Sequence, residues 1–199
     1  MTENNENQDT MATEMDKMDF TIGVPEVFQP ETEEDVQVEE ITRNGYTVIE
    51  NGLTEAELSY IKDNKKLEEI YEIQLKEVGG EDQLCSIGDQ YSAKHLLVYD
   101  DFFVKLLANE KVIPIVKRIF GDYFILHWQN AILNYPGVFN PASVWHRDLA
   151  YQHFTTSRPI SLTALHVIDD FSEETGGTVI LPGSHRDEKF PSPGFVKKH

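Results

Sequence analysis

The chain has 199 residues, of which 40% are hydrophobic and 26% are charged, so we expect a soluble protein with one domain large enough for a core. Its net charge of −18, without any basic run, makes it a poor candidate for binding nucleic acid or an anionic membrane surface. It contains no apolar stretch of membrane-spanning length and no secretory signal pattern, and its one cysteine, Cys85, excludes an intrachain disulfide. We therefore expect a cytoplasmic protein.

The acidic charge is concentrated at the N-terminal end. Residues 1–40 contain thirteen Asp and Glu against the single Lys17, which leaves only −6 of the total charge to residues 41–199. This segment also has few apolar residues with which to build a core. We predict that residues 1–35 form a disordered acidic leader and that residues 36–199 form the domain.

Helical patterns come first in the domain, after a short strand predicted over residues 45–50. Thr54 and Glu57 form a capping-box pattern, and the apolar residues that follow predict a helix over 54–76. The glycine pair in "EVGGEDQ" ends this helix. Two further helices are predicted over residues 100–108 and 110–120.

From residue 122 onward the sequence is rich in aromatic and β-branched residues, with turn-forming residues between the runs. No long helical pattern separates these runs, and successive strands without crossover helices indicate an antiparallel sheet, a sandwich or a barrel. The predicted strands cover residues 123–135, 143–148, 159–170 and 176–184.

The tripeptide His-Arg-Asp occurs twice, at residues 146–148 and 185–187. If residues 143–148 are extended, His146 and Asp148 project from the same face and Arg147 projects from the other. An imidazole and a carboxylate side by side are two of the three ligands in the facial triad that suits non-haem Fe(II). On spacing alone, a surface His–Asp pair at the end of a strand is an open alternative.

The second copy has a different context. His185 follows Pro182 and Gly183 in a predicted turn, so we expect it to bind the backbone rather than a metal. A protein-kinase catalytic loop also contains this tripeptide, but the sequence lacks the glycine-rich loop and the Asp-Phe-Gly motif of kinases. Among the other histidines, His127 and His166 are predicted to be core or sheet residues, and His153 is a candidate for the mouth of a site.

Longer motifs surround these residues. The domain opens with "NGYTVIENGLTEAEL" and continues through "VIPIVKRIFGDYFIL". The most specific part is "VWHRDLAY", followed after an interval by "ALHVIDDFSEETGGTVILPGSHR". With these motifs, residues 41–199 resemble the phytanoyl-CoA dioxygenase family of Fe(II)- and 2-oxoglutarate-dependent oxygenases.

The resemblance implies an α+β protein with a mainly β core. Its fold would be a double-stranded β-helix, which is a jelly-roll or cupin-like barrel, with the N-terminal helices packed outside. It implies that His146 and Asp148 are iron ligands at the mouth of the barrel. Gln129 and Asn134 are similar to family positions that contact 2-oxoglutarate or substrate; they are five residues apart, so at most one points inward from a regular strand.

The activity implied by the resemblance is hydroxylation of an aliphatic carbon of a small-molecule substrate. The cofactors would be Fe(II) and 2-oxoglutarate, with O₂ consumed and succinate and CO₂ released. In this family the third iron ligand is a His on a late strand, and a following Arg pairs with 2-oxoglutarate. No residue after His185 matches either position, so the last strands are expected to be missing here.

Two explanations remain open at this point. The sequence is expected to be a fragment of a longer oxygenase, and the alternative is an inactive truncated oxygenase. The competing function is a jelly-roll binding module that has the same fold and no turnover. The substrate and the oligomeric state are not indicated by the sequence.

Overall fold

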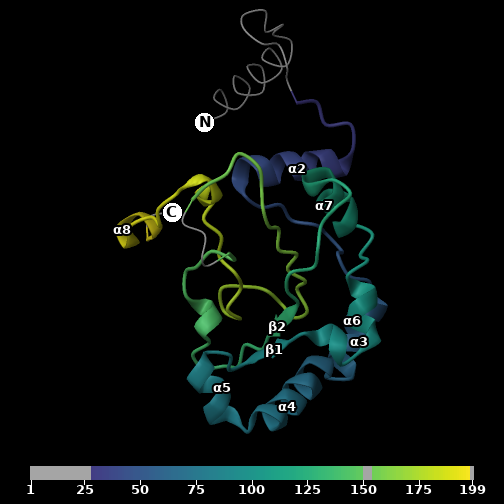
Figure 1. The fold of residues 1–199 in the computed structure, drawn as a ribbon, viewed down its shortest axis with the longest axis vertical. Helices are drawn as coiled ribbons and strands as arrows, with labels where there is room; N and C mark the ends of the chain where they lie inside the picture. Colours follow the sequence, from purple (N-terminus) through teal and green to yellow (C-terminus); the bar gives the residue numbers. More distant parts are fainter. Residues whose placement is uncertain (1–27, 150–153, 198–199) are drawn as a thin grey trace, which may run out of the picture. The chain divides into compact units, whose positions relative to one another are not determined.

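The computed structural model describes residues 28–149 and 154–197. Contacts divide the chain into two units, Met1–Glu31 and Thr32–His199, and all elements below belong to the second unit. Figure 1 shows these elements as a ribbon. Their bounds are α2 Glu33–Asn44, α3 Glu55–Asp63, α4 Lys66–Val78, α5 Glu81–Ile87, β1 Ser92–Lys94, η1 Leu96–Val98, α6 Asp101–Leu106, α7 Val112–Phe120, β2 Asn130–Ile132, η2 Pro141–Ser143, η3 Ser184–Arg186 and α8 Pro193–Val196.

Helix α2 begins with a capping box. The Thr32 hydroxyl accepts a hydrogen bond from the Asp35 N–H at 3.2 Å, and the Asp35 carboxylate accepts one from the Thr32 N–H at 3.1 Å. The helix ends at Gly45, whose φ of 88° is in the left-handed region that favours glycine. Helix α2 thus begins at Glu33, within the last residues of the predicted leader, and residues 1–27 of that prediction lie outside the part of the chain that is described.

The helix predicted over residues 54–76 is two helices. Its predicted start is confirmed, because the Thr54 hydroxyl accepts a hydrogen bond from the Glu57 N–H and the Glu57 carboxylate bonds back to the Thr54 N–H. The chain then breaks between α3 and α4 at Lys65, whose φ of 48° is left-handed. A helical stripe would need an apolar residue at 64 or 65, and the polar pair Asn64 and Lys65 stands there instead.

The two remaining predicted helices are confirmed in shorter form as α6 and α7. Helices α4, α5 and α6 build the main core together with the short strand β1. Strand β1 pairs antiparallel with β2, with Ala93 opposite Ala131. The side chain of Gln74 in α4 bonds the backbone of Lys94 twice, because it accepts from the Lys94 N–H and donates to the Lys94 carbonyl. The buried cluster consists of Ile70, Tyr71, Leu84, Ala93, Leu96, Phe103, Leu106 and Leu133.

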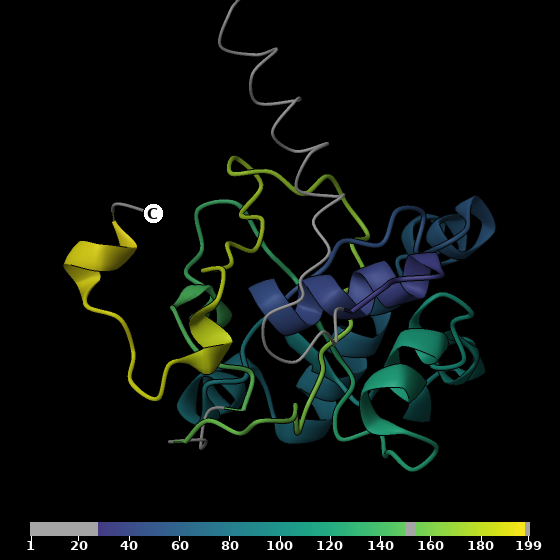
Figure 2. The ribbon, with the colours of Figure 1, turned by 90° about the horizontal axis from the view of Figure 1, so that it is seen from above.

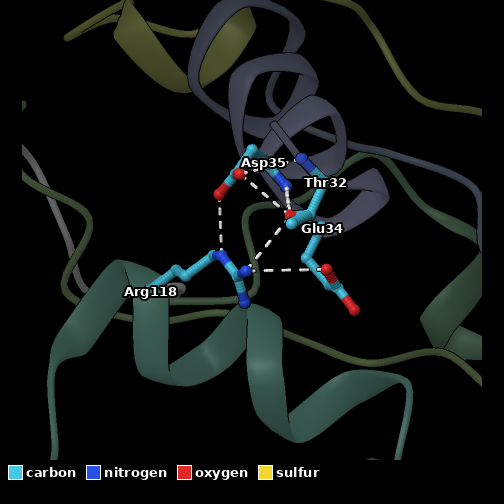
Figure 3. Close-up of polar contacts among 4 residues, drawn as sticks. All are labelled: Thr32, Glu34, Asp35 and Arg118. Atoms are coloured by element: carbon cyan, nitrogen blue, oxygen red, sulfur yellow. Dashed lines mark hydrogen bonds and ion pairs between the residues drawn. The ribbon is translucent and has the colours of Figure 1, made fainter. Parts of the chain in front are cut away.

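Helices α2 and α7 are connected through Arg118 (Figure 3). The Arg118 Nε donates to the Asp35 carboxylate at 2.8 Å, and its Nη2 donates to the Thr32 hydroxyl at 3.1 Å. The same Nη2 lies 3.5 Å from a Glu34 carboxylate oxygen. One guanidinium thus pairs with two carboxylates of the first turn of α2 and joins them to α7, beside which α2 lies in Figures 1 and 2.

The strand predictions are largely wrong for the described residues. The strand predicted over 123–135 is reduced to β2, and the segments 45–50, 143–148, 159–170 and 176–184 contain no strand. A strand requires a hydrogen-bonded neighbour, and in the described part of the chain the only sheet is the pair β1–β2. Side chains suited to a sheet interior, such as Ile125, Leu165 and Val179, are exposed.

The described residues therefore have an α+β architecture with one small sheet. The jelly roll that the resemblance implied is not formed in this part of the chain. No helix among the described residues has the length and apolarity needed to cross a membrane.

Candidate metal centre

His146 and Asp148 lie in an irregular segment directly after the 3₁₀ turn η2. Although no strand forms here, Val144 has extended backbone angles, with φ −82° and ψ 150°. The two side chains approach each other, with 3.8 Å between His146 Nε2 and a carboxylate oxygen of Asp148. The two side chains thus lie near each other, as they would on one face of a strand, but the predicted strand itself is absent.

One hydrogen bond determines which ring nitrogen of His146 has a lone pair available for a metal ion. Its Nδ1 lies 2.6 Å from the Val144 carbonyl oxygen, which can only accept, so Nδ1 carries the proton and donates. In the neutral imidazole the lone pair is then on Nε2, the nitrogen that faces Asp148. Metal-binding histidines are commonly oriented in this way by a backbone carbonyl on the other ring nitrogen.

The spacing of the pair can be compared with what a metal requires. Two ligand atoms about 2.1 Å from one ion and at a right angle to each other are about 3.0 Å apart. The observed distance of 3.8 Å is wider than this. The side chains of His146 and Asp148 are 50% and 59% exposed. An imidazole nitrogen and a carboxylate oxygen are donor types that a divalent ion accepts, and these two atoms would have to move closer together to bind the same ion.

A third ligand is not found among the residues that the structure describes. No group of three His, Cys, Asp or Glu side chains in this part of the chain is close enough to hold a metal ion. His153, predicted at the mouth of the site, and His199 both fall in the segments that are not described.

The second His-Arg-Asp copy has a different position, as predicted. His185 lies in the 3₁₀ turn η3, and its Nε2 is 3.2 Å from the Thr42 carbonyl near the end of α2. Arg186 donates to the same carbonyl, and the Gly183 N–H donates to the Asn44 carbonyl at 2.7 Å. The prediction that His185 binds the backbone in a turn is confirmed.

Gly45 explains how the η3 turn fits against α2. A Cβ added to Gly45 would lie 2.5 Å from His185 Nδ1, which is too close for any side chain. The absence of a side chain at this position therefore makes room for the imidazole, and Figures 1 and 2 both show η3 beside the end of α2. The contact of Gly45 with His185 could not be read from the sequence pattern.

Gln129 has its side-chain amide engaged at both ends. Its Oε1 accepts from the Leu97 N–H at 3.0 Å, and its Nε2 donates to the Phe103 carbonyl at 3.1 Å. Its backbone carbonyl also accepts from the His95 N–H at 2.8 Å. In this structure Gln129 connects η1 and α6 to the segment before β2, and its role toward a cofactor stays a prediction.

Asn134, the second predicted cofactor residue, is exposed and contacts the glycine pair of the family-like motif. Its Nδ2 donates to the Gly176 carbonyl at 3.3 Å. A Cβ on Gly176 would lie 2.8 Å from the same nitrogen, and the φ of 79° at Gly176 also favours glycine. Asn134 thus contacts Gly176, forty-two residues further along the chain, and its role toward a cofactor is a prediction as well.

His127 and His166, which had the same prediction, differ from each other in exposure. His127 is exposed, which contradicts its prediction as a core or sheet residue, because the segment around it forms no strand. His166 is half-buried, and burial lowers its pKa below the ordinary value of 6.5, while the nearby Glu57 carboxylate partly raises it. His166 is therefore held as a neutral imidazole near neutral pH.

The sequence was compared with curated proteins. The chain is 29% identical over 162 residues to a protein of Mycobacterium tuberculosis described as uncharacterized, and equally to its counterpart in Mycobacterium bovis. It is 24% identical over 168 residues to a protein of Stutzerimonas stutzeri named "Probable alpha-ketoglutarate-dependent hypophosphite dioxygenase". These alignments cover 78% and 77% of this chain.

The alignments cover 57% of the mycobacterial proteins and 54% of the Stutzerimonas protein, so the chain spans about half the length of these curated relatives. No solved structure matches the chain. The sequence profile of the phytanoyl-CoA dioxygenase family matches residues 41–199, which is most of the chain. The chain therefore belongs to the phytanoyl-CoA dioxygenase family.

Proposed function

We propose that this chain forms part of an Fe(II)- and 2-oxoglutarate-dependent dioxygenase that hydroxylates an aliphatic carbon of a small molecule. The observation that carries the proposal is the orientation of His146, whose Nδ1 is held by the Val144 carbonyl and whose Nε2 faces Asp148. Family membership supports it, and so does the name of the Stutzerimonas relative.

In this proposal the residues of the chain have separate tasks. His146 Nε2 and the Asp148 carboxylate hold the metal, and the Val144 carbonyl keeps the imidazole in the required tautomer. Asn134 is the better candidate of the two amides for binding the co-substrate, because it is exposed and its amide bonds one backbone group, whereas both ends of the Gln129 amide bond the backbone. The metal would supply the activation of O₂, with 2-oxoglutarate as the reductant that leaves as succinate and CO₂.

The proposal extends to the fold. The exposed strand-like segments 159–168 and 176–181 have the composition of strands without neighbours to pair with in the described part of the chain. We infer that they become strands of a jelly roll when further chain supplies their partners and the third iron ligand. The greater length of the relatives supports this inference.

One experiment tests the metal ligands directly. Anaerobic addition of Fe(II) and 2-oxoglutarate should produce a visible charge-transfer band, and Asp148→Ala should abolish that band because it removes the anionic ligand. The matched control is Asp187→Ala, which removes the carboxylate of the second His-Arg-Asp copy and should leave the band unchanged. A full band in Asp148→Ala would contradict the ligand assignment.

A second candidate function is a non-catalytic jelly-roll binding module. It is favoured by the lack of a three-residue ligand group among the described residues. The coding sequence after the codon for His199 separates the two candidates. A strand-like segment with a His, followed by an Arg, supports the dioxygenase, and an immediate stop codon supports the binding module.

A further inference from the structure

The two His-Arg-Asp copies are in contact with each other through the first arginine. Arg147, the residue between the two proposed metal ligands, donates from Nη2 to the backbone carbonyl of Asp187 in the second copy. Its guanidinium carbon also lies 5.2 Å from the centre of the Phe190 ring, within the range of a cation–π contact. Arg147 is half-buried, whereas His146 and Asp148 on either side of it are exposed.

The segment that receives Arg147 is itself fastened to the helical part of the domain. It directly follows η3, which is joined to the end of α2 by the hydrogen bonds of Gly183, His185 and Arg186. Helix α2 is joined in turn to α7 through Arg118. A continuous series of contacts thus runs from α7 and α2 through the second copy to the Arg147 side chain of the first.

The segment that carries His146 and Asp148 needs such support. It is not part of a strand, so no ladder of backbone hydrogen bonds holds it in place. Two ligands that are free to separate lose conformational entropy when they close on an ion, and this loss weakens binding. An arginine between the two ligands that is held by a distant segment of the chain would reduce that loss.

We propose that Arg147 is a positioning residue, which holds the His146–Asp148 segment against the second His-Arg-Asp copy and so preorganises the metal-binding pair. This inference rests on the proposed function for its metal-binding part. The second copy then has a defined task, as an anchor for the first copy and not as a second metal site. Arginine suits this task because one planar group donates to a carbonyl while its face contacts an aromatic ring.

The test uses the full chain and Co(II), an O₂-stable probe of the metal site. Arg147→Ala should raise the dissociation constant for Co(II) about 10-fold or more, the effect typical of residues that orient metal ligands. Arg147→Lys keeps a cation near Phe190 and one donor, so it should restore part of the affinity. The control is Arg158→Ala. The hydrogen bond between Arg158 and the Thr156 hydroxyl uses the backbone carbonyl of Arg158, so this substitution leaves that bond in place.

A second measurement needs no metal. Hydrogen exchange of the backbone amides in residues 185–190 should become faster in metal-free Arg147→Ala and should not change in Arg158→Ala. Unchanged exchange would overturn the anchoring, and faster exchange with unchanged Co(II) affinity would overturn the positioning role.

The failure of this inference can be distinguished from the failure of the proposed function. If His146→Ala and Asp148→Ala bind Co(II) as well as the unmodified chain, the ligand assignment is wrong, and the positioning role of Arg147 falls with it. If those two variants lose Co(II) while Arg147→Ala retains full affinity, only the inference about Arg147 is wrong.

Discussion

The helical region, residues 33–120, and the extended region, residues 121–197, differ in how they are stabilised. Every member of the main core cluster except Leu133 comes from the helical region. The extended region contains the proposed metal ligands and leaves large apolar side chains such as Ile160 and Leu165 exposed. A helix satisfies its backbone hydrogen bonds within itself, whereas a strand depends on a neighbour, so the helices of the first region need less from distant parts of the chain than strands in the second would.

The largest expected effect on stability comes from comparing the loss of one isoleucine side chain in each region. Ile70→Ala removes a core side chain that is 3% exposed and should lower the free energy of unfolding by about 2–5 kcal/mol. Ile160→Ala removes a side chain that is 53% exposed and should cost about 0.5 kcal/mol or less. Urea unfolding measures both. A large cost for Ile160→Ala would show that residue 160 is buried in solution, and the contrast between the regions would then be wrong.

The Asp100 carboxylate combines three contacts in the helical region. It accepts from the Phe102 N–H at the start of α6 and from the Tyr60 hydroxyl at 2.8 Å, and Lys66 Nζ lies 3.4 Å away. Asp100→Ala should therefore cost about 1–2 kcal/mol in the free energy of unfolding, measured by urea titration.

The matched control for Asp100 is Asp101→Ala, which changes the next carboxylate in the chain and leaves the helix cap in place. Equal costs for the two variants would contradict the capping role of Asp100. Asp100→Asn, which retains an acceptor for the Phe102 N–H, should recover part of the loss.

Substitution of Arg118 tests a charged contact within the helical region. Arg118→Ala removes the bridge between α7 and the first turn of α2 and should cost about 0.5–1 kcal/mol, because these side chains are partly exposed. The loss should become smaller in 1 M NaCl, since salt screens exposed charges. Lys117→Ala, on the same helix, is the control. A loss that does not depend on salt would indicate that packing, and not charge, is what Arg118 contributes.

The smallest expected effect concerns His166, which connects the extended region with α3 near Glu57. Its pKa in the folded chain is below 6.5, so the unfolded chain takes up the proton first as the pH falls. Stability should therefore decrease slightly as the pH drops below 6.5. Thermal unfolding from pH 7.5 to 5 measures this decrease.

His166→Gln should flatten that pH dependence, whereas His127→Gln, at an exposed position, should not. The lowered pKa of Glu57 contributes in a separate window, because stability from a carboxylate is lost only as the pH falls below its ordinary value of 4.5. A wild-type pH dependence in His166→Gln would mean that another group is responsible.

The sequence predicts the helical region better than the extended region for a physical reason. The capping box of Thr54 and Glu57 spans three residues, so the start of α3 is contained in the local pattern. The break at Lys65 was missed, although the interrupted apolar stripe was visible in the sequence. The strands were overpredicted because β-branched composition indicates a preference for strands but supplies no partner.

For the candidate site, the sequence predicted that His146 and Asp148 would lie side by side on a strand; the two side chains are 3.8 Å apart, but the strand is absent. The engagement of Gln129 by Leu97 and Phe103 could not be predicted, because those partners lie 32 and 26 residues away in the chain. The contact of Asn134 with Gly176 spans 42 residues and was equally out of reach.

By itself, the sequence determined the starts of α3 and α6 and the family to which the chain belongs, whereas helix α2 was not predicted. Only the tertiary structure showed that the two copies of the tripeptide contact each other, because Arg147 and Asp187 are 40 residues apart. Caps and glycine stops act over a few residues and can be read from a pattern. Contacts between distant segments depend on how the chain folds back, and identical tripeptides therefore came to have different positions and different proposed tasks.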